Sequence, residues 1–129
     1  LHQLPNRPDY CVEVENTDTE GVDVLLELLS REDRPTAFMV SDDILALSLE
    51  RVCIQKQLRI PQDVSIITFN NSLVTRMAFP RLTSVAINAY QLGQEAATQV
   101  INHILDPELP VTKTIVPHRI IERESCCSI

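Results

Sequence analysis

The chain has 129 residues, of which 44% are hydrophobic and 22% are charged, and its formal net charge is −7. The length suits a single globular domain with a modest core. The negative charge and the scattered basic residues argue against a chain that grips a phosphate backbone, because such binding needs clustered lysine and arginine. No apolar run approaches the length that spans a membrane.

The first third of the chain predicts a strand, a helix and a polar turn. Residues 10–14 alternate between polar and apolar side chains, as a half-buried strand does. A helix follows, with Thr17 or Asp18 as its N-cap and with leucines at helical spacing along one face. A polar turn then leads to Pro35, which introduces the next strand.

A βαβ unit lies at the centre of the sequence. The apolar run at residues 36–40 and the β-branched run at 64–69 have the length of strands, and an amphipathic helix at 44–57 joins them. Strands of this kind should be parallel and buried on both faces. This pattern predicts a three-layer α/β fold with a mostly parallel sheet.

The remainder of the chain predicts a loop, a further strand and one long helix. The loop runs from Ser72 to Arg81 and is marked by Phe79 and Pro80, and a short strand follows at residues 82–86. The helix at 89–105 has a flat apolar face of small residues. The sequence after it predicts two strand-like segments, at 113–116 and 119–122.

Polar clusters follow the predicted strands. Asp42 and Asp43 come after the first strand of the βαβ unit, Asn70 and Asn71 after the second, and Asn16 after the strand at residues 10–14. Each cluster can also be explained locally, as a helix N-cap or as a turn. Because ligands of open parallel sheets bind beyond the carboxyl ends of the strands, the clusters together predict a crevice for a neutral, hydroxyl-rich ligand.

The sequence offers little for catalysis or for a cofactor. Paired carboxylates can do acid–base chemistry, but no histidine or serine stands at a comparable position. Neither a glycine-rich phosphate loop nor a nucleophile elbow follows any strand. The cysteines lack metal-binding spacing and suit a reducing cytoplasm as free thiols: Cys11, Cys53, Cys126 and Cys127. We therefore expect no enzyme activity, no metal and no cofactor.

Five stretches resemble, in order and spacing, the lactose/galactose-type bacterial transcriptional repressors. They are RPTAFMVSDDILAL from Arg34, LRIPQDVSIITFNN from Leu58, FPRLTSV from Phe79, LGQEAA from Leu92 and RIIERES from Arg119. The resemblance covers roughly residues 17 to 125. The stretches around Asn70 and from Thr83 to Gly93 are particularly similar to maltose-operon repressors of Gram-positive bacteria.

The resemblance implies a site and a domain organisation. In the family, a sugar effector lies in a cleft between two subdomains that resemble periplasmic sugar-binding proteins. Asp43 and Asn70 fall on sugar-contacting positions, with Asp42 and Asn71 beside them, and Asn16 lies near another position of the cleft. Two departures should alter which hydroxyls are preferred, because Asp42 stands where the family has asparagine and Asn70-Asn71 where it usually has an aspartate pair.

The resemblance also places the chain within a longer protein. Residues 1–129 are expected to be the carboxyl-terminal part of an effector-binding domain, with the helix at 89–105 belonging to the other subdomain. Operator DNA would be bound only through a helix-turn-helix domain outside this chain, and the protein would be cytoplasmic without membrane contact. The rival interpretation, from another class, is a periplasmic-type sugar-binding protein of a transporter, which a signal peptide upstream would indicate.

A homodimer is expected because the helix at 44–57 is apolar on more sides than one sheet can cover. In the resembled family this helix and the segment from Leu73 to Val85 form the dimer interface. The residues expected near the two-fold axis are Leu45, Leu49, Val52, Met77 and Phe79.

Overall fold

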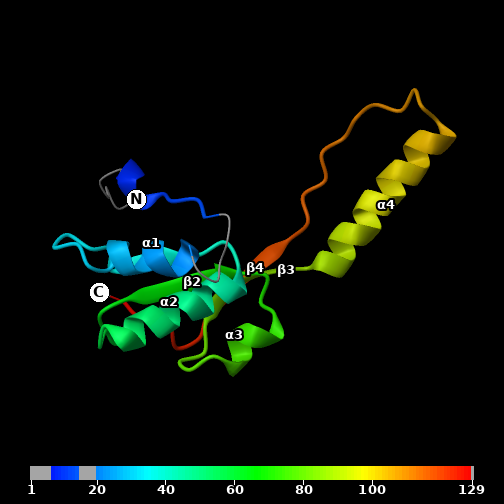
Figure 1. Ribbon diagram of the computed structural model, residues 1–129. Helices are drawn as coiled ribbons and strands as arrows, with labels where there is room; N and C mark the ends of the chain where they lie inside the picture. The colour runs from blue at the N-terminus through cyan, green and yellow to red at the C-terminus, as the bar shows by residue number, and fades with distance from the viewer. Residues whose placement is uncertain (1–6, 15–19, 129) are drawn as a thin grey trace.

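A four-stranded sheet organises the protein, as seen in a computed structural model that describes residues 7–14 and 20–128 (Figure 1). Its strands, in spatial order, are β1 (Ala37–Met39), β2 (Ser65–Phe69), β3 (Thr83–Ile87) and β4 (His118–Ile121). The first three are parallel, and β4 runs antiparallel to β3. The predicted α/β class and the mostly parallel sheet are confirmed.

Helices alternate with the strands along the chain. A short 3-10 helix, η1 (Pro8–Tyr10), comes first in the described part of the chain. The α-helices are α1 (Glu20–Leu28), α2 (Asp43–Gln55), α3 (Leu73–Met77) and α4 (Ala89–Leu105). The βαβ unit predicted at the centre of the sequence is β1, α2 and β2, with β1 at the edge of the sheet and β2 beside it.

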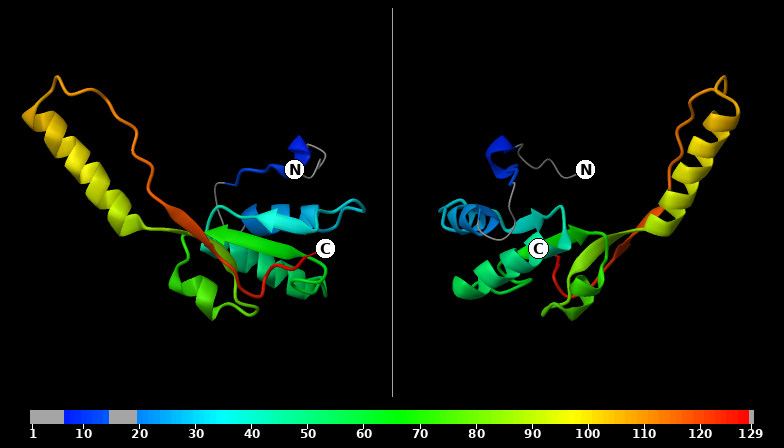
Figure 2. Two further views of the ribbon diagram at one scale, coloured as in Figure 1. Left: turned by 180° about the vertical axis from the view of Figure 1, so that it is seen from behind. Right: turned by 45° about the vertical axis from the view of Figure 1, so that its right-hand side comes forward.

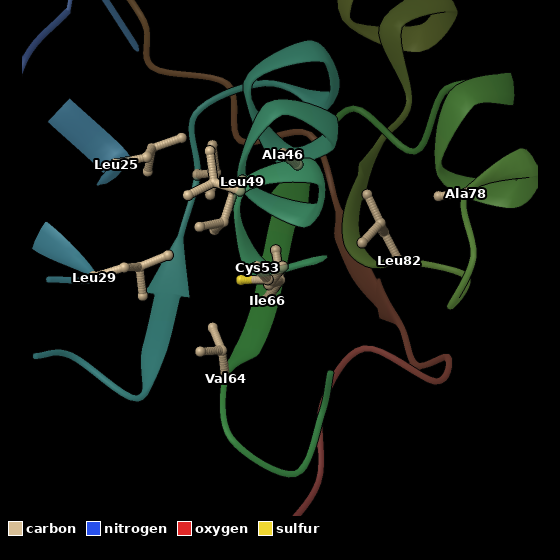
Figure 3. Packing of buried hydrophobic residues seen from close by; sticks show 11 residues of the cluster. Leu25, Leu29, Ala46, Leu49, Cys53, Val64, Ile66, Ala78 and Leu82 are labelled. Atoms are coloured by element: carbon tan, nitrogen blue, oxygen red, sulfur yellow. The ribbon is translucent and has the colours of Figure 1, made fainter. Parts of the chain in front are cut away.

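The apolar core lies between the helices α1 and α2 and one face of the sheet (Figure 3). Leu49 on α2 and Ile66 on β2 are fully buried, and Leu25 and Leu29 reach them from α1 and the turn after it. The periodicity of α2 explains this arrangement, because residues three and four apart share one helix face. The core therefore fixes α2, and with it the residues at its first turn.

The expected third layer is not formed by the described residues. Figure 2 shows α4 projecting away from the sheet, with the segment after it returning separately to β4. None of the 17 residues of α4 is buried. On the sheet face opposite α2, Met39 is 72% exposed. No helix among the described residues is long and apolar enough to cross a membrane.

Three local predictions are wrong. Residues 11–14 form no strand, although their polarity alternates: a strand also needs a hydrogen-bonded partner, and these residues do not pair with the edge strand β1. Residues 113–116 are likewise irregular, and only β4 forms after Pro117. In place of a loop after Asn71, Ser72 caps the five-residue helix α3 by accepting a hydrogen bond from the Val74 amide at 3.3 Å.

The residues expected at a dimer axis separate into two groups. Leu49 and Val52 are 0% and 1% exposed within this chain's own core, so their assignment to a dimer interface is wrong. Leu45 is half-buried against the same core. Met77 and Phe79 are 75% and 91% exposed, and on α2 the exposed apolar side chains are instead Ile44 and Ile54. Helical periodicity showed that α2 is apolar on several sides without showing which side faces inward.

Candidate functional site

Asp42 lies at the carboxyl end of β1 and caps α2. Its Oδ1 accepts hydrogen bonds from the Ile44 amide at 2.8 Å and the Leu45 amide at 2.9 Å. The backbone of Asp42 is extended, with φ −145° and ψ 164°, as an N-cap residue requires. The local explanation of Asp42 as a helix cap is thus confirmed, and its charge favours the amino end of the helix dipole.

Asp43 holds three elements together from a buried position. The residue is 5% exposed. Its Oδ1 accepts a hydrogen bond from the Thr68 hydroxyl on β2 at 3.0 Å, and its Oδ2 accepts one from the Ser72 amide at 3.0 Å. Both carboxylate oxygens thus join α2 to the end of β2 and to the start of α3. These contacts give Asp43 an internal role, while its expected contact with an effector stays a prediction.

Asn70 and Asn71 form a left-handed turn at the carboxyl end of β2. Their φ angles are 81° and 50°, a conformation that asparagine tolerates better than most residues. The Asn70 amide donates to the Val85 carbonyl at 3.0 Å, and the Asn71 amide donates to the Ser84 hydroxyl at 3.0 Å. Neighbouring β3 therefore holds the backbone of the turn.

The two side chains of this turn differ in availability. Asn71 is half-buried, and its Oδ1 accepts a hydrogen bond from Arg123 at 2.5 Å. Asn70 is exposed, and its side chain makes no hydrogen bond with the described residues. Its amide can therefore offer two donors and one acceptor to a ligand beyond the edge of the sheet.

The structure brings together the clusters that follow the two central strands. Because β1 and β2 are parallel neighbours, their carboxyl ends meet, and Ser72 links Asn71 to Asp43 directly. Asn16 lies outside the described residues, so the third cluster has no structural account. Sequence reasoning missed Thr68, Ser84 and Arg123 as partners, and the only signal for Arg123 was its place in the family-like ending RIIERES.

The chemistry of this edge favours binding. The described residues contain no group of three or more histidine, cysteine or acidic side chains that could hold a metal ion. Cys53 is buried, and burial raises the pKa of its thiol to about 11, so the thiolate that reacts is scarce at neutral pH. This edge carries an exposed amide at the end of β2 and two carboxylates at the end of β1 that accept hydrogen bonds from the chain, and such groups can also bond the hydroxyls of a neutral ligand.

One further carboxyl group, Glu50 on α2, is buried on the side of the helix facing the loop after α3. It is 6% exposed and accepts a hydrogen bond from the Phe79 amide, while its Oε1 has no partner among the described residues. Burial raises the pKa of Glu50 to about 7, and the bond from Phe79 opposes this shift. The folded chain therefore binds this proton more tightly than the unfolded chain does.

This difference predicts a pH-dependent stability. The contribution of Glu50 is fully present below its unfolded pKa and is lost as the pH rises through about 7. Glu50→Gln should therefore raise the free energy of unfolding by about 1–3 kcal/mol at about pH 8, with little effect at about pH 5. Urea denaturation at both pH values measures this change, with exposed Glu32→Gln as the matched control. Equal effects of Glu50→Gln at the two pH values would contradict it.

Residues 2–126 match the family of periplasmic binding protein-like domains, and the chain belongs to this family. Among curated relatives, it is 32% identical over 122 residues to catabolite control protein A of Priestia megaterium, covering 95% of this chain and 37% of that protein. It is 28% identical over 123 residues to the HTH-type transcriptional repressor PurR of Yersinia pestis bv. Antiqua (strain Antiqua), covering 95% and 36%. The chain thus spans little more than a third of these relatives.

Two solved structures show the same fold with sugars bound. A LacI family transcriptional regulator from Enterococcus faecalis V583, with bound ribose, superposes with a TM-score of 0.78 at 30% identity, over 92% of this chain and 43% of that one. The complex of the transcriptional regulator CelR with cellobiose gives a TM-score of 0.77 at 27% identity, over 86% and 34%. The described fold is therefore that of LacI-type effector domains.

Proposed function

We propose that this chain is the carboxyl-terminal part of the effector-binding domain of a sugar-responsive transcriptional repressor. The observation that carries the proposal is the polar edge of this sheet, where the neighbouring parallel strands β1 and β2 end in two carboxylates and in an exposed asparagine amide. The similar regulators, one with bound ribose and one with cellobiose, support a sugar as its effector. In this role the chain senses a carbohydrate and performs no catalysis.

The whole protein would act on DNA through a separate helix-turn-helix domain. The net charge of −7 makes this chain itself a poor partner for a phosphate backbone. Repression of carbohydrate-use genes, in the cytoplasm, follows from this proposal. The similarity to transcriptional regulators supports it over the transporter-type sugar-binding protein.

As a narrower proposal, the effector is maltose or a maltodextrin. Its support is the likeness of the stretches around Asn70 and from Thr83 to Gly93 to those of maltose-operon repressors. The ligands of the two similar structures are a pentose and a different disaccharide, so the three sugars form a natural test panel.

The α4 helix would complete the other subdomain. Its exposed apolar side chains are Leu92, Val100, Ile101, Ile104 and Leu105. Such a face is stable in water only when another surface covers it. In our proposal that surface is the amino-terminal subdomain of the same effector domain.

The repressor would also be a homodimer. Exposed apolar side chains gather around α3 and the loop after it, where Leu73 is 61% exposed together with Met77 and Phe79. Neighbouring α2 adds exposed Ile44 and Ile54. A surface of this kind resembles the apolar centre of a subunit interface.

The decisive experiment removes the Asn70 amide. Asn70→Gly keeps the left-handed backbone accessible while deleting the side chain, and should weaken binding of the recognised sugar about five- to tenfold. Isothermal titration of the whole protein with maltose, cellobiose and ribose measures this affinity. Gln62→Ala, which removes an exposed amide before the opposite end of β2, is the matched control. Unchanged affinity in Asn70→Gly would remove Asn70 from the site, and no binding of any of the three sugars by the wild-type protein would contradict the proposed effectors.

A further inference from the structure

A single guanidinium group from the end of the chain reaches into the turn that carries Asn70. Arg123 follows β4 by two positions, and its Nη2 donates to Asn71 Oδ1 at 2.5 Å. Its Nη1 donates to the Leu82 carbonyl at 2.5 Å and to the Thr75 hydroxyl at 3.2 Å. The planar fork therefore joins the turn, α3 and the start of β3.

The backbone around Arg123 is itself anchored to the sheet. The Arg123 amide donates to the Thr83 hydroxyl at 3.0 Å. Two residues on, buried Ser125 accepts a hydrogen bond from the Thr83 amide at 2.8 Å and donates one to the Ile66 carbonyl at 2.5 Å. The Ile66 amide in turn donates to the Ser125 carbonyl at 2.8 Å. The guanidinium thus extends from a fixed point.

The hydrogen bonds of the Arg123 side chain go to neutral groups and not to a carboxylate. All of its side-chain hydrogen-bond partners are neutral oxygens, and burial lowers its pKa, with repulsion from Arg76 and Arg81 adding to the effect. The side chain nevertheless remains a cation at neutral pH. A half-buried cation held by neutral acceptors contributes mainly through the geometry that it imposes on them.

The turn needs such a constraint. Two consecutive non-glycine residues with positive φ occupy a sparsely populated region of backbone conformation, which persists only when the surroundings hold it. Val85 and Ser84 hold the two backbone amides, and Arg123 alone among the described residues bonds a side chain of the turn.

We propose that Arg123 is a positioning residue of the effector site, which holds Asn71 and thereby presents the Asn70 amide at the sheet edge. The inference rests on the proposed sugar site. Because Arg123 takes one of the two lone pairs of Asn71 Oδ1, the side chain of Asn71 has less acceptor capacity left for a ligand, whereas the Asn70 amide keeps both donors and its acceptor.

The test is a double-mutant cycle with two readouts. The first readout is hydrogen exchange of the Asn71 backbone amide, followed by NMR, which requires no sugar. Arg123→Met should accelerate this exchange about tenfold or more and weaken sugar binding about tenfold in titrations with maltose, cellobiose and ribose. Arg123→Lys, which keeps the charge and loses the fork, should fall between wild type and Arg123→Met in both readouts.

The cycle separates positioning from a general loss of stability. In an Asn71→Gly background, Arg123→Met should have little further effect on sugar affinity, because the bond it removes is already absent. Arg81→Gln breaks the neighbouring ion pair with Glu124 in the same tail and should leave both readouts unchanged. Fully additive effects of Arg123→Met and Asn71→Gly, or unchanged exchange at Asn71 in Arg123→Met, would overturn the proposal. If the wild-type protein binds none of the sugars, the proposed function fails, and the exchange readout still decides the role of Arg123.

Discussion

Replacing Asp43 with alanine is expected to lower the free energy of unfolding by about 2–4 kcal/mol. The substitution deletes the acceptor of two hydrogen bonds and leaves the Thr68 hydroxyl, which is fully buried, and the Ser72 amide without their partner. Hydrogen bonds to an ionised group contribute more than neutral ones, and an unsatisfied buried donor carries a further cost. Urea denaturation, followed by circular dichroism, measures the change.

Two variants separate this effect from its alternatives. Asp42→Ala removes only a helix cap and should cost about 0.5–2 kcal/mol, less than Asp43→Ala. Asp43→Asn keeps one acceptor oxygen and should be intermediate, so it is the variant in which sugar binding can be measured on a folded protein. Wild-type stability in Asp43→Ala would refute the internal role, and wild-type sugar affinity in Asp43→Asn would argue against a direct contact with the effector.

Leu49→Ala is expected to cost about 2–5 kcal/mol of stability without changing self-association. Leu49 is fully buried beside Ile66 and Cys53, and truncation to alanine would leave a cavity in the centre of the core. The same denaturation experiment measures the loss, and sedimentation of the folded variant measures its association. A loss of dimer with unaltered stability would return Leu49 to the interface that the sequence predicted for it.

For Phe79→Ser we expect the opposite result in the same two measurements: weaker self-association with unchanged stability. Its side chain is 91% exposed, so the substitution should leave the stability of the subunit nearly unchanged. If the surface around α3 is the dimer interface, the dimer dissociation constant should rise about tenfold or more. A folded wild-type monomer at micromolar concentration in sedimentation would sink the homodimer proposal.

The sequence predicted the elements whose signals are local and strong. The apolar runs around Phe38 and Ile66, with the helix between them, were sufficient to predict a βαβ unit and parallel strands, because near-continuous apolar runs joined by a helix are typical of parallel sheets. Because the strands are parallel, Asp43 after β1 and Asn70 and Asn71 after β2 lie at the same edge of the sheet. The helix α4 was equally plain, since its period continues over 17 residues.

The wrong predictions concern features that depend on a partner elsewhere in the chain as well as on the local pattern of side chains. Alternation at residues 11–14 satisfied the side-chain pattern of a strand, but pairing depends on a neighbour that no local pattern shows. Leu49 and Val52 lie on an apolar helix face, and which face points inward is decided by the sheet and by α1. The five-residue helix α3 is too short to show a period, and only its cap at Ser72 could have indicated it.

The site shows the same division. Asp42 and Asn70 could be found from residue type and position after a strand, because caps and turns are local. The contact between Arg123 and Asn71 joins residues 52 positions apart in the chain, and no spacing rule reports such a partner. For the positive φ of Asn70 and Asn71, the only indication in the sequence was that asparagine tolerates this conformation better than most residues.

The anchoring of the chain end to the middle of the sheet has a consequence for biosynthesis. The bond from Ser125 to Ile66 spans 59 positions of sequence, so the contact order of this part of the fold is high. During translation β2 and β3 would leave the ribosome well before the segment that fastens them together. The strands are fastened together only after Ser125 emerges, and before β4 emerges the unpaired edge of β3 is exposed to chaperones or to another nascent chain. A premature stop ahead of Arg123 would therefore leave the fold unfinished, because the contacts of Arg123 and Ser125 would be missing.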